Sequence, residues 1–413
     1  MKIIIFLLVF CVIFITFEIY SYQAVKTLIK NNTFLNTYIF ISAILFVGII
    51  FYLLKFDRTK GMTLTNMYTM GALLLVLVPK IVVTFVMFGE DIVRVFIGII
   101  NSFINSDVKQ DFLPERRKFV SQIGLGLAAI PFLSLIYGIT IGRYNFKVIK
   151  QSLFFDDLPD AFDGFRITQI SDVHSGSFDN PEKINYAIDL VNEQHSDLIL
   201  FTGDIVNNKA EEMLPWIDVF NKIEPHKYGK FAVLGNHDYG EYIDFPDAQA
   251  KQDNFEAIKN LYGKIGFDLL LNEHKFIQKD TEQLAIVGVE NWGKGFKQAG
   301  DLEKAAGNLT QNDFKILMSH DPSHWEYEVK NHPKHFQLTL SGHTHGMQFG
   351  IEIPGIIKWS LAQFAYKQWA GLYENLGRFI YVNRGFGFHA YPGRVGIMPE
   401  ITVIELKKAK KVV

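Results

Sequence analysis

Four long apolar stretches in the first 141 residues restrict the fold more than any other feature of the chain. They cover residues 3–19, 38–54, 70–88 and 119–141. A membrane-spanning helix needs roughly 20 mostly apolar residues, so each stretch is close to the length of one crossing. The first stretch has no small-residue cleavage site and further stretches follow it, which argues against a signal peptide. We therefore predict a transmembrane region over residues 1–143.

The number of crossings depends on residues 93–104, an apolar run that is short for a full span and suits either an interfacial helix or a fifth crossing. Arg116, Arg117 and Lys118 precede the last stretch and predict that its start is cytoplasmic. Five crossings would also place Lys55, Arg58 and Lys60 inside, whereas four would not, so we favour five. The last stretch would then carry the rest of the chain to the outer side of a bacterial-type inner membrane.

The back half has a different pattern. After an expected linker at 144–163, strand-like runs such as "FRITQI", "DLILF" and "FKILM" alternate with helical runs such as "PEKINYAIDLVN" up to residue 413. Alternating strands and helices predict an α/β domain. The strand-like runs are almost continuously apolar, which indicates sheets covered on both faces.

Polar residues follow one predicted strand after another. Ligands of open α/β sheets bind beyond the carboxyl ends of the strands. Five motifs lie at such positions: "SDVHSG", "TGDIV", "LGNHDYG", "MSHDP" and "SGHTHGM". They supply seven candidate metal ligands, which are Asp172, His174, Asp204, Asn236, His320, His343 and His345. Asp172/His174 and His343/His345 are i, i+2 pairs, and we expect the members of each pair to face the same way.

The ligand types define the chemistry. All 12 histidines lie at or after His174, and the single cysteine, Cys11, lies in an apolar run. Imidazole and carboxylate without thiolate suit Mn²⁺, Fe²⁺ or Zn²⁺. Seven ligands exceed the needs of one catalytic ion but suit two ions that share a carboxylate. Such a pair is suited to phosphoryl transfer to water.

The motif order D-x-H, G-D, G-N-H-[DE], H, G-H-x-H resembles that of the calcineurin-like metallophosphoesterases, over about residues 164–406. Through "YVNRGFG", "GRVG" and "PEI" the chain is most similar to the bacterial phosphodiesterases of the YaeI/YkuE type. The resemblance implies a four-layer α/β/β/α sandwich over residues 164–413. It assigns Asp172, His174 and His345 to one metal, Asn236, His320 and His343 to the other, and Asp204 to both. It also implies that His237 assists at the leaving group or contacts the phosphate, with Asp238 as its partner.

One departure bears on the substrate. The Ser/Thr protein phosphatases carry G-D-x-x-D-R, whereas this chain has "GDIVNN", with Asn207 and Asn208 and without the phosphate-binding arginine at that point. This difference favours a phosphodiester over a monoester. Arg384 and Arg394 are the candidates for binding a substrate phosphate. We expect structural or solvated roles for His195 and His226 near helix ends, for His332 and His335 in a polar loop, and for His389 near the C-terminal Arg-Gly segment.

The segment "IEIPGIIKWSLAQFAYKQWAG", residues 351–371, is apolar for a connection. It is either a cap that packs on the domain or an apolar lip, including Trp359 and Trp369, that faces a lipid substrate or the bilayer.

These patterns predict a membrane-anchored hydrolase, most favourably a phosphodiesterase acting on lipid-linked or cell-envelope phosphate esters. One alternative is a UDP-2,3-diacylglucosamine-type pyrophosphohydrolase of lipid A synthesis. Another is a membrane sensor or transport module with an inactive hydrolase domain. The net charge of -2 gives no case for nucleic-acid binding.

Overall fold

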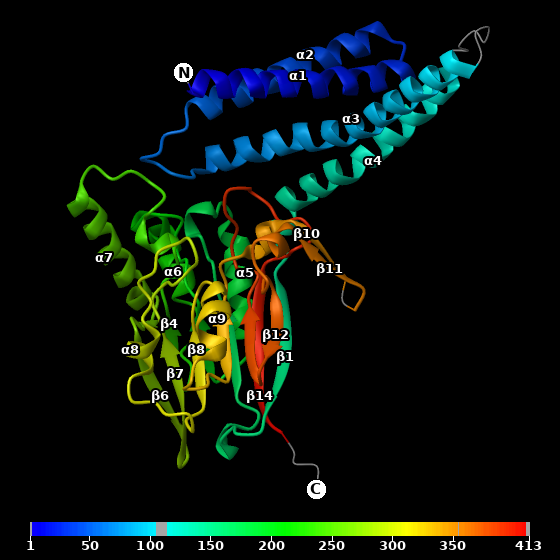
Figure 1. Ribbon diagram of the computed structural model, residues 1–413. Helices are drawn as coiled ribbons and strands as arrows, with labels where there is room; N and C mark the ends of the chain where they lie inside the picture. Colours follow the sequence, from blue (N-terminus) through cyan, green and yellow to red (C-terminus); the bar gives the residue numbers. More distant parts are fainter. Residues whose placement is uncertain (1, 105–113, 354, 410–413) are drawn as a thin grey trace. The chain divides into compact units, whose positions relative to one another are not determined.

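The computed structural model describes residues 2–104, 114–353 and 355–409, which form two compact units (Figure 1). The first unit comprises residues 1–56 and 68–137, and the second comprises residues 57–67 and 138–413.

The first unit is helical. Among the described residues, four helices are long and apolar enough to cross a membrane, namely α1 (Lys2–Leu28), α2 (Asn32–Leu54), α3 (Leu64–Ile104) and α4 (Pro114–Thr140). Residues 93–104 continue α3 without a break, so the preference for five crossings was wrong. The charges before this segment are paired, since Arg117 of α4 lies 2.5 Å from Glu90 and 2.8 Å from Asp91.

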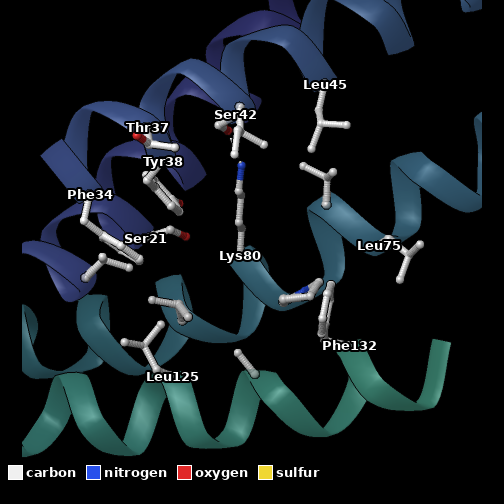
Figure 2. A pocket seen from close by; sticks show the side chains of 16 residues that line it. Ser21, Phe34, Thr37, Tyr38, Ser42, Leu45, Leu75, Lys80, Leu125 and Phe132 are labelled. Atoms are coloured by element: carbon white, nitrogen blue, oxygen red, sulfur yellow. Dashed lines mark hydrogen bonds between the residues drawn. The ribbon is translucent and has the colours of Figure 1, made fainter. Parts of the chain in front are cut away.

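A polar cluster lies between these helices. Lys80 of α3 donates a hydrogen bond to Glu18 of α1 and another, 2.7 Å long, to Ser42 of α2. Its ammonium group also lies 4.8 Å from the centre of the Phe14 ring. An apolar cavity of about 460 Å³ adjoins the cluster and is lined from all four helices (Figure 2). The pairing explains how a lysine and a glutamate are accommodated in an apolar helical unit.

The second unit contains two six-stranded sheets and one separate hairpin. The first sheet has, in spatial order, β1 (Lys147–Phe155), β14 (Glu400–Lys408), β2 (Arg166–Ile170), β3 (Leu198–Phe201), β4 (Lys230–Ala232) and β5 (Asp268–Leu269). The second has β12 (Gly371–Asn375), β13 (Arg378–Val382), β9 (Leu338–Ser341), β8 (Lys315–Met318), β7 (Glu282–Gly288) and β6 (Glu273–Lys279). The hairpin joins β10 (Gly350–Ile353) to β11 (Ile357–Ser360).

Alternate side chains of these strands face different layers. In β3, Leu198 and Leu200 pack between the two sheets, whereas Ile199 and Phe201 face the helices. Helices α5 (Pro181–Asn192), α6 (Ile217–Phe220) and α7 (Ala248–Lys264) cover the first sheet, and α8 (Leu302–Ala306) and α9 (Ser323–Tyr327) cover the second. The unit is therefore the four-layer α/β/β/α sandwich expected from the sequence.

The segment expected as a linker is part of this sandwich. All nine residues of β1 pair in parallel with β14, from Lys147 opposite Glu400 to Phe155 opposite Lys408. Leu153 and Phe155 are buried between the sheets. Apolar residues do not alternate in "KVIKQSLFF", so the sequence gives no period-two signal for this edge strand.

Candidate metal centre

The seven candidate ligands come together at the carboxyl ends of five strands. Asp172 and His174 follow β2, Asp204 follows β3, Asn236 follows β4, His320 follows β8, and His343 and His345 follow β9. Because β2, β3 and β4 are parallel in one sheet and β8 and β9 are parallel in the other, these ends gather at one edge of the sandwich.

The candidate ligands form two groups that share no residue, and a third group of His174, Asp204 and His237 overlaps both. Asp172, His174 and His345 place one ligand atom each within 4.8 Å of one another, and so do Asp204, His320 and His343. Asp204 also connects the groups, since its Oδ2 atom lies 3.1 Å from His320 Nε2 and 3.6 Å from His174 Nε2.

Asn236 completes the second group. Its Oδ1 atom lies 2.7 Å from His343 Nδ1 and 3.1 Å from His320 Nε2.

Left-handed backbone conformations aim these side chains. Five of the seven ligands have positive φ angles, namely Asp172 (52°), His174 (49°), Asp204 (61°), His343 (71°) and His345 (49°). For a non-glycine residue this conformation costs roughly 1–2 kcal/mol. Such strain concentrates at functional sites.

These turns also explain one wrong expectation. The members of the pair His343/His345 do not face the same way, because they lie beyond the end of β9 and enter different groups.

Two glycines allow this close packing of loops. A Cβ atom on Gly235 would lie 2.1 Å from Asp204 Oδ1. A Cβ atom on Gly342 would lie 2.0 Å from Ser171 Oγ and 2.2 Å from Asp172 Oδ2. Either methyl group would displace a candidate ligand.

The donor set fits divalent metal ions. It consists of imidazole nitrogens and carboxylate and amide oxygens, which suit borderline-to-hard ions. His345 Nε2 is buried without a hydrogen-bond partner among the described residues. Thr202 O accepts from His320 Nδ1 at 2.6 Å, so Nε2 of that ring is the nitrogen that faces the group.

Comparison with known proteins agrees with this geometry. The family model described as "Calcineurin-like phosphoesterase" matches residues 165–347, and the model "Probable Calcineurin-like phosphoesterase, transmembrane domain" matches residues 1–143. The metallophosphoesterase YkuE of Bacillus subtilis is 32% identical over 265 residues, which cover 63% of this chain and 83% of that protein. The chain belongs to the calcineurin-like metallophosphoesterases.

More distant relatives differ in length. The "Transmembrane protein with metallophosphoesterase domain" of Danio rerio is 26% identical over 66% of this chain, and the match spans only 60% of that protein. A solved structure of a 5'-nucleotidase precursor from Thermus thermophilus covers 59% of this chain and 54% of its own at 11% identity, with a TM-score of 0.34. The present metallophosphoesterase is a membrane protein with four candidate spans and a metal-dependent phosphoesterase domain.

Electrostatics within the site follow from burial and mutual contact. Burial alone would raise the pKa of Asp204, but His320 and His237 hold it well below its ordinary value. Burial would lower the pKa of His320, but Asp204 and Asp172 raise it to about 10. Burial and the neighbouring His237 keep the pKa of His174 well below its ordinary value. The anionic Asp204 and the neutral His174 are in the protonation states that bind a cation.

His237 and Asp238 have different surroundings from those expected. The Nδ1 atom of His237 lies 2.7 Å from the carbonyl oxygen of Asn207 and therefore donates to it, which leaves Nε2 to exchange a proton. Asp238 is fully buried, and its carboxylate accepts hydrogen bonds from the backbone N–H groups of Asp204, Ile205 and Gly235. The partner of His237 is thus the Asn207 carbonyl, and the expectation that Asp238 pairs with it was wrong.

The contacts of Arg384 and Arg394 contradict the prediction that they bind a substrate phosphate. Arg384 lies 2.5 Å from both Glu352 and Glu400. Arg394 is fully buried and donates to the carbonyl groups of Arg384 and Gly387. Both side chains hold loops together beside the candidate ligands.

Sequence reasoning missed three side chains at this site. His389 stacks on His174 with ring centres 4.9 Å apart, and its Nδ1 atom lies 3.0 Å from Asn207 Oδ1. Tyr366 places its hydroxyl 2.7 Å from His343 Nε2. Tyr242 accepts a hydrogen bond from Asn236 at 2.7 Å. His389 was considered but assigned a structural role, and the tyrosines belong to no motif.

Proposed function

We propose that this metallophosphoesterase is a phosphodiesterase that works with two divalent metal ions at the membrane surface. The observation that carries the proposal is the pair of ligand groups joined by Asp204. One ion would be held by Asp172, His174 and His345, the other by Asn236, His320 and His343, and Asp204 would serve both. Mn²⁺, Fe²⁺ and Zn²⁺ all suit these ligands.

The bound ions would neutralise charge on the phosphoryl group and lower the pKa of a water molecule. The chain's own residues divide the remaining tasks. His237 Nε2 is positioned to deliver a proton to the leaving oxygen, since its Nδ1 atom is fixed on Asn207. Tyr366 and Tyr242 orient His343 and Asn236 through their hydroxyl groups.

A diester is favoured over a monoester by charge. A monoester carries up to two negative charges, and a site for it gains from an unpaired arginine. In this chain Asn208 stands at the position of that arginine, and the amide oxygen of Asn207, one residue earlier, lies 3.1 Å from His174 Nδ1. Arg384 and Arg394 are engaged by carboxylates and carbonyl groups. Because both arginines are engaged by protein groups, the site suits the single negative charge of a phosphodiester better than the two charges of a monoester.

The side of the membrane follows from the connection between α2 and α3. Residues 57–67 belong to the second unit, and Met67 is part of its core. Two crossings, α3 and α4, separate this connection from residue 138, which is consistent with four spans. We place the catalytic unit outside the cytoplasm, because Arg116, Arg117 and Lys118 lie at the opposite end of α4. Lys55, Arg58 and Lys60 then lie on the outer side, so the three charges before α4 carry the assignment. The test is a reporter enzyme that works only in the cytoplasm, fused after Val413. Activity of this reporter would contradict the proposed orientation and favour a cytoplasmic pyrophosphohydrolase.

Membrane anchoring leads us to propose lipid-linked or cell-envelope phosphate esters as substrates. The complete ligand set argues against an inactive sensor domain, since a domain released from catalysis would have no need to retain all seven residues.

The test uses the full-length protein with an aryl phosphodiester and the matching monoester, with Mn²⁺, with Zn²⁺ and with chelator. We expect metal-dependent cleavage of the diester and a loss of at least about 100-fold in Asp204→Asn, since even indirect contacts of metal ligands contribute 10–100-fold. Asp189→Asn, on the exposed face of α5, is the matched control and should retain full activity. Cleavage of the diester that survives both chelator and Asp204→Asn would refute the proposal.

A further inference from the structure

The β10–β11 hairpin and the turn that follows it expose an unusual number of apolar side chains. We use the name apolar lip for Ile351, Ile353, Ile356, Trp359, Leu361 and Phe364. Ile356 is 81% exposed and Phe364 is 78% exposed. The hairpin pairs with neither six-stranded sheet and projects from the body of the second unit (Figure 1). Contiguous exposed apolar surface of this kind marks a contact with a membrane or with another protein.

The base of the apolar lip lies where the chain leaves the last membrane span. Gly350, the first residue of β10, donates its N–H to the carbonyl oxygen of Val395 at 2.9 Å. The preceding residue, Arg394, donates its N–H to the carbonyl oxygen of Gly138 at 3.1 Å. Gly138 lies two residues before Thr140, where α4 ends. Backbone hydrogen bonds therefore connect the base of the lip to Gly138, in the last turn of α4.

The apolar lip is also linked to the candidate metal centre. Glu352 of β10 forms an ion pair with Arg384, which in turn pairs with Glu400. Tyr366, two residues after Phe364, places its hydroxyl 2.7 Å from His343 Nε2. One continuous segment thus carries exposed apolar side chains at its start and a contact to a candidate metal ligand at its end.

We propose that the apolar lip inserts into the surface of the bilayer in which the chain is anchored. The metal centre would then take an amphiphilic phosphodiester whose acyl part stays in the membrane. Isoleucine, leucine and phenylalanine partition into the acyl boundary, and Trp359, 38% exposed, suits the interface. The substrate part of this inference rests on the proposed phosphodiesterase activity, whereas the insertion does not.

Trp369 is not part of the apolar lip. It is only 5% exposed and packs with Ala362, Ala370 and Ile397. The cap prediction is therefore confirmed for the part around Trp369, and the expectation that Trp369 belongs to the lip was wrong. Residues near Trp369 pack on the domain, and the lip residues do not.

Insertion can be measured without catalysis. The chain has one cysteine, so Cys11→Ser provides a background for single labelling sites. Ile356→Cys and Leu376→Cys would each carry an environment-sensitive fluorophore in the full-length protein in lipid nanodiscs. Leu376 is a matched control, because it is 69% exposed and lies in the β12–β13 turn, at the end of β13 opposite to Arg384.

We expect nitroxide-labelled lipids to quench the probe at position 356 but not at 376, and aqueous iodide to do the reverse. Iodide quenching of both probes alike would overturn the proposal. A probe at 356 that is shielded from iodide, is not quenched by the lipids, and responds to protein concentration would also overturn it, since a second copy of the chain would then cover the lip.

Activity gives a second readout. Ile356→Asp with Phe364→Asp should lower the ratio of hydrolysis of a vesicle-borne diester to that of a soluble aryl diester by about tenfold or more. An unchanged ratio would refute the role of the lip in substrate access. If Asp204→Asn abolishes cleavage of the soluble diester while lipid and iodide quench the probes at 356 and 376 alike, the phosphodiesterase activity is supported and insertion of the lip is refuted. If lipids quench the probe at 356 but no ester is cleaved, insertion of the lip is supported and the proposed phosphodiesterase activity is refuted.

Discussion

Replacing Asp238 by alanine should unfold the catalytic unit more readily, because this carboxylate joins the loops that carry two of the motifs. Its Oδ2 atom accepts from the N–H groups of Asp204 at 3.0 Å and Gly235 at 2.9 Å, and from the hydroxyl of Tyr262 at 2.8 Å. Its Oδ1 atom accepts from the N–H group of Ile205 at 3.0 Å. All four donors lose their acceptor in Asp238→Ala.

The size of the effect follows from these four bonds. A buried donor left without a partner costs about 1–3 kcal/mol. Taking the lower end for each donor gives a loss of about 4 kcal/mol in the free energy of unfolding. Asp238→Asn keeps one acceptor oxygen, so its free energy of unfolding should fall by about half as much. Tyr262→Phe removes only one bond and should lose about 1 kcal/mol.

The assay is urea unfolding followed by tryptophan fluorescence. All five tryptophans lie in the second unit, so the signal reports on that unit alone. Chelator is present throughout, because bound metal would add its own stabilisation. Asp238→Ala that unfolds within about 0.5 kcal/mol of wild type, yet has lost activity, would refute the reasoning and return Asp238 to a catalytic role. Equal losses in Tyr262→Phe and Asp238→Ala would refute it as well.

Three further predictions concern metal, membrane and pH. Removing metal should lower the melting temperature of wild type, since a ligand at a hundred times its Kd stabilises by about 2.7 kcal/mol, and should leave Asp204→Asn almost unchanged in scanning fluorimetry. Lys80→Met should destabilise the helical unit by about 3–5 kcal/mol, because Glu18 is left without its cation, and adding Glu18→Leu should recover part of the loss in detergent unfolding assays. Equal loss in the single and double variants would contradict that pairing. Burial would raise the pKa of Glu326, but Lys330, Lys367 and Gln368 lower it from 4.5 to about 2. Its stabilisation is therefore present above pH 4.5 and lost as the pH falls towards 2. Glu326→Gln should lose about 1 kcal/mol at pH 7, a value reduced for solvent screening, and the difference from wild type should shrink as the pH falls from 4.5 towards 2 in urea unfolding.

The sequence predicted the outline of the fold because the relevant signals are local. Each of the four apolar stretches is long enough to define a helix by itself, and each strand-like run ends in its own polar motif. The pairing of Glu90 in α3 with Arg117 of α4 was not local, since the two residues come from different helices. The edge strand β1 was missed for the same reason, because its partner β14 lies about 250 residues later in the chain.

The types and order of the candidate ligands were thus determined by the sequence alone, since imidazole, carboxylate and amide groups are properties of single residues. Their grouping was decided by the tertiary structure. His343 and His345 are two residues apart but enter different groups, because left-handed turns after β9 aim them apart. The arginines looked free in the sequence, yet Glu352 and Glu400 engage Arg384 from distant strands. Contacts of this kind arise only when strands far apart in the chain are brought together, and no local pattern encodes them.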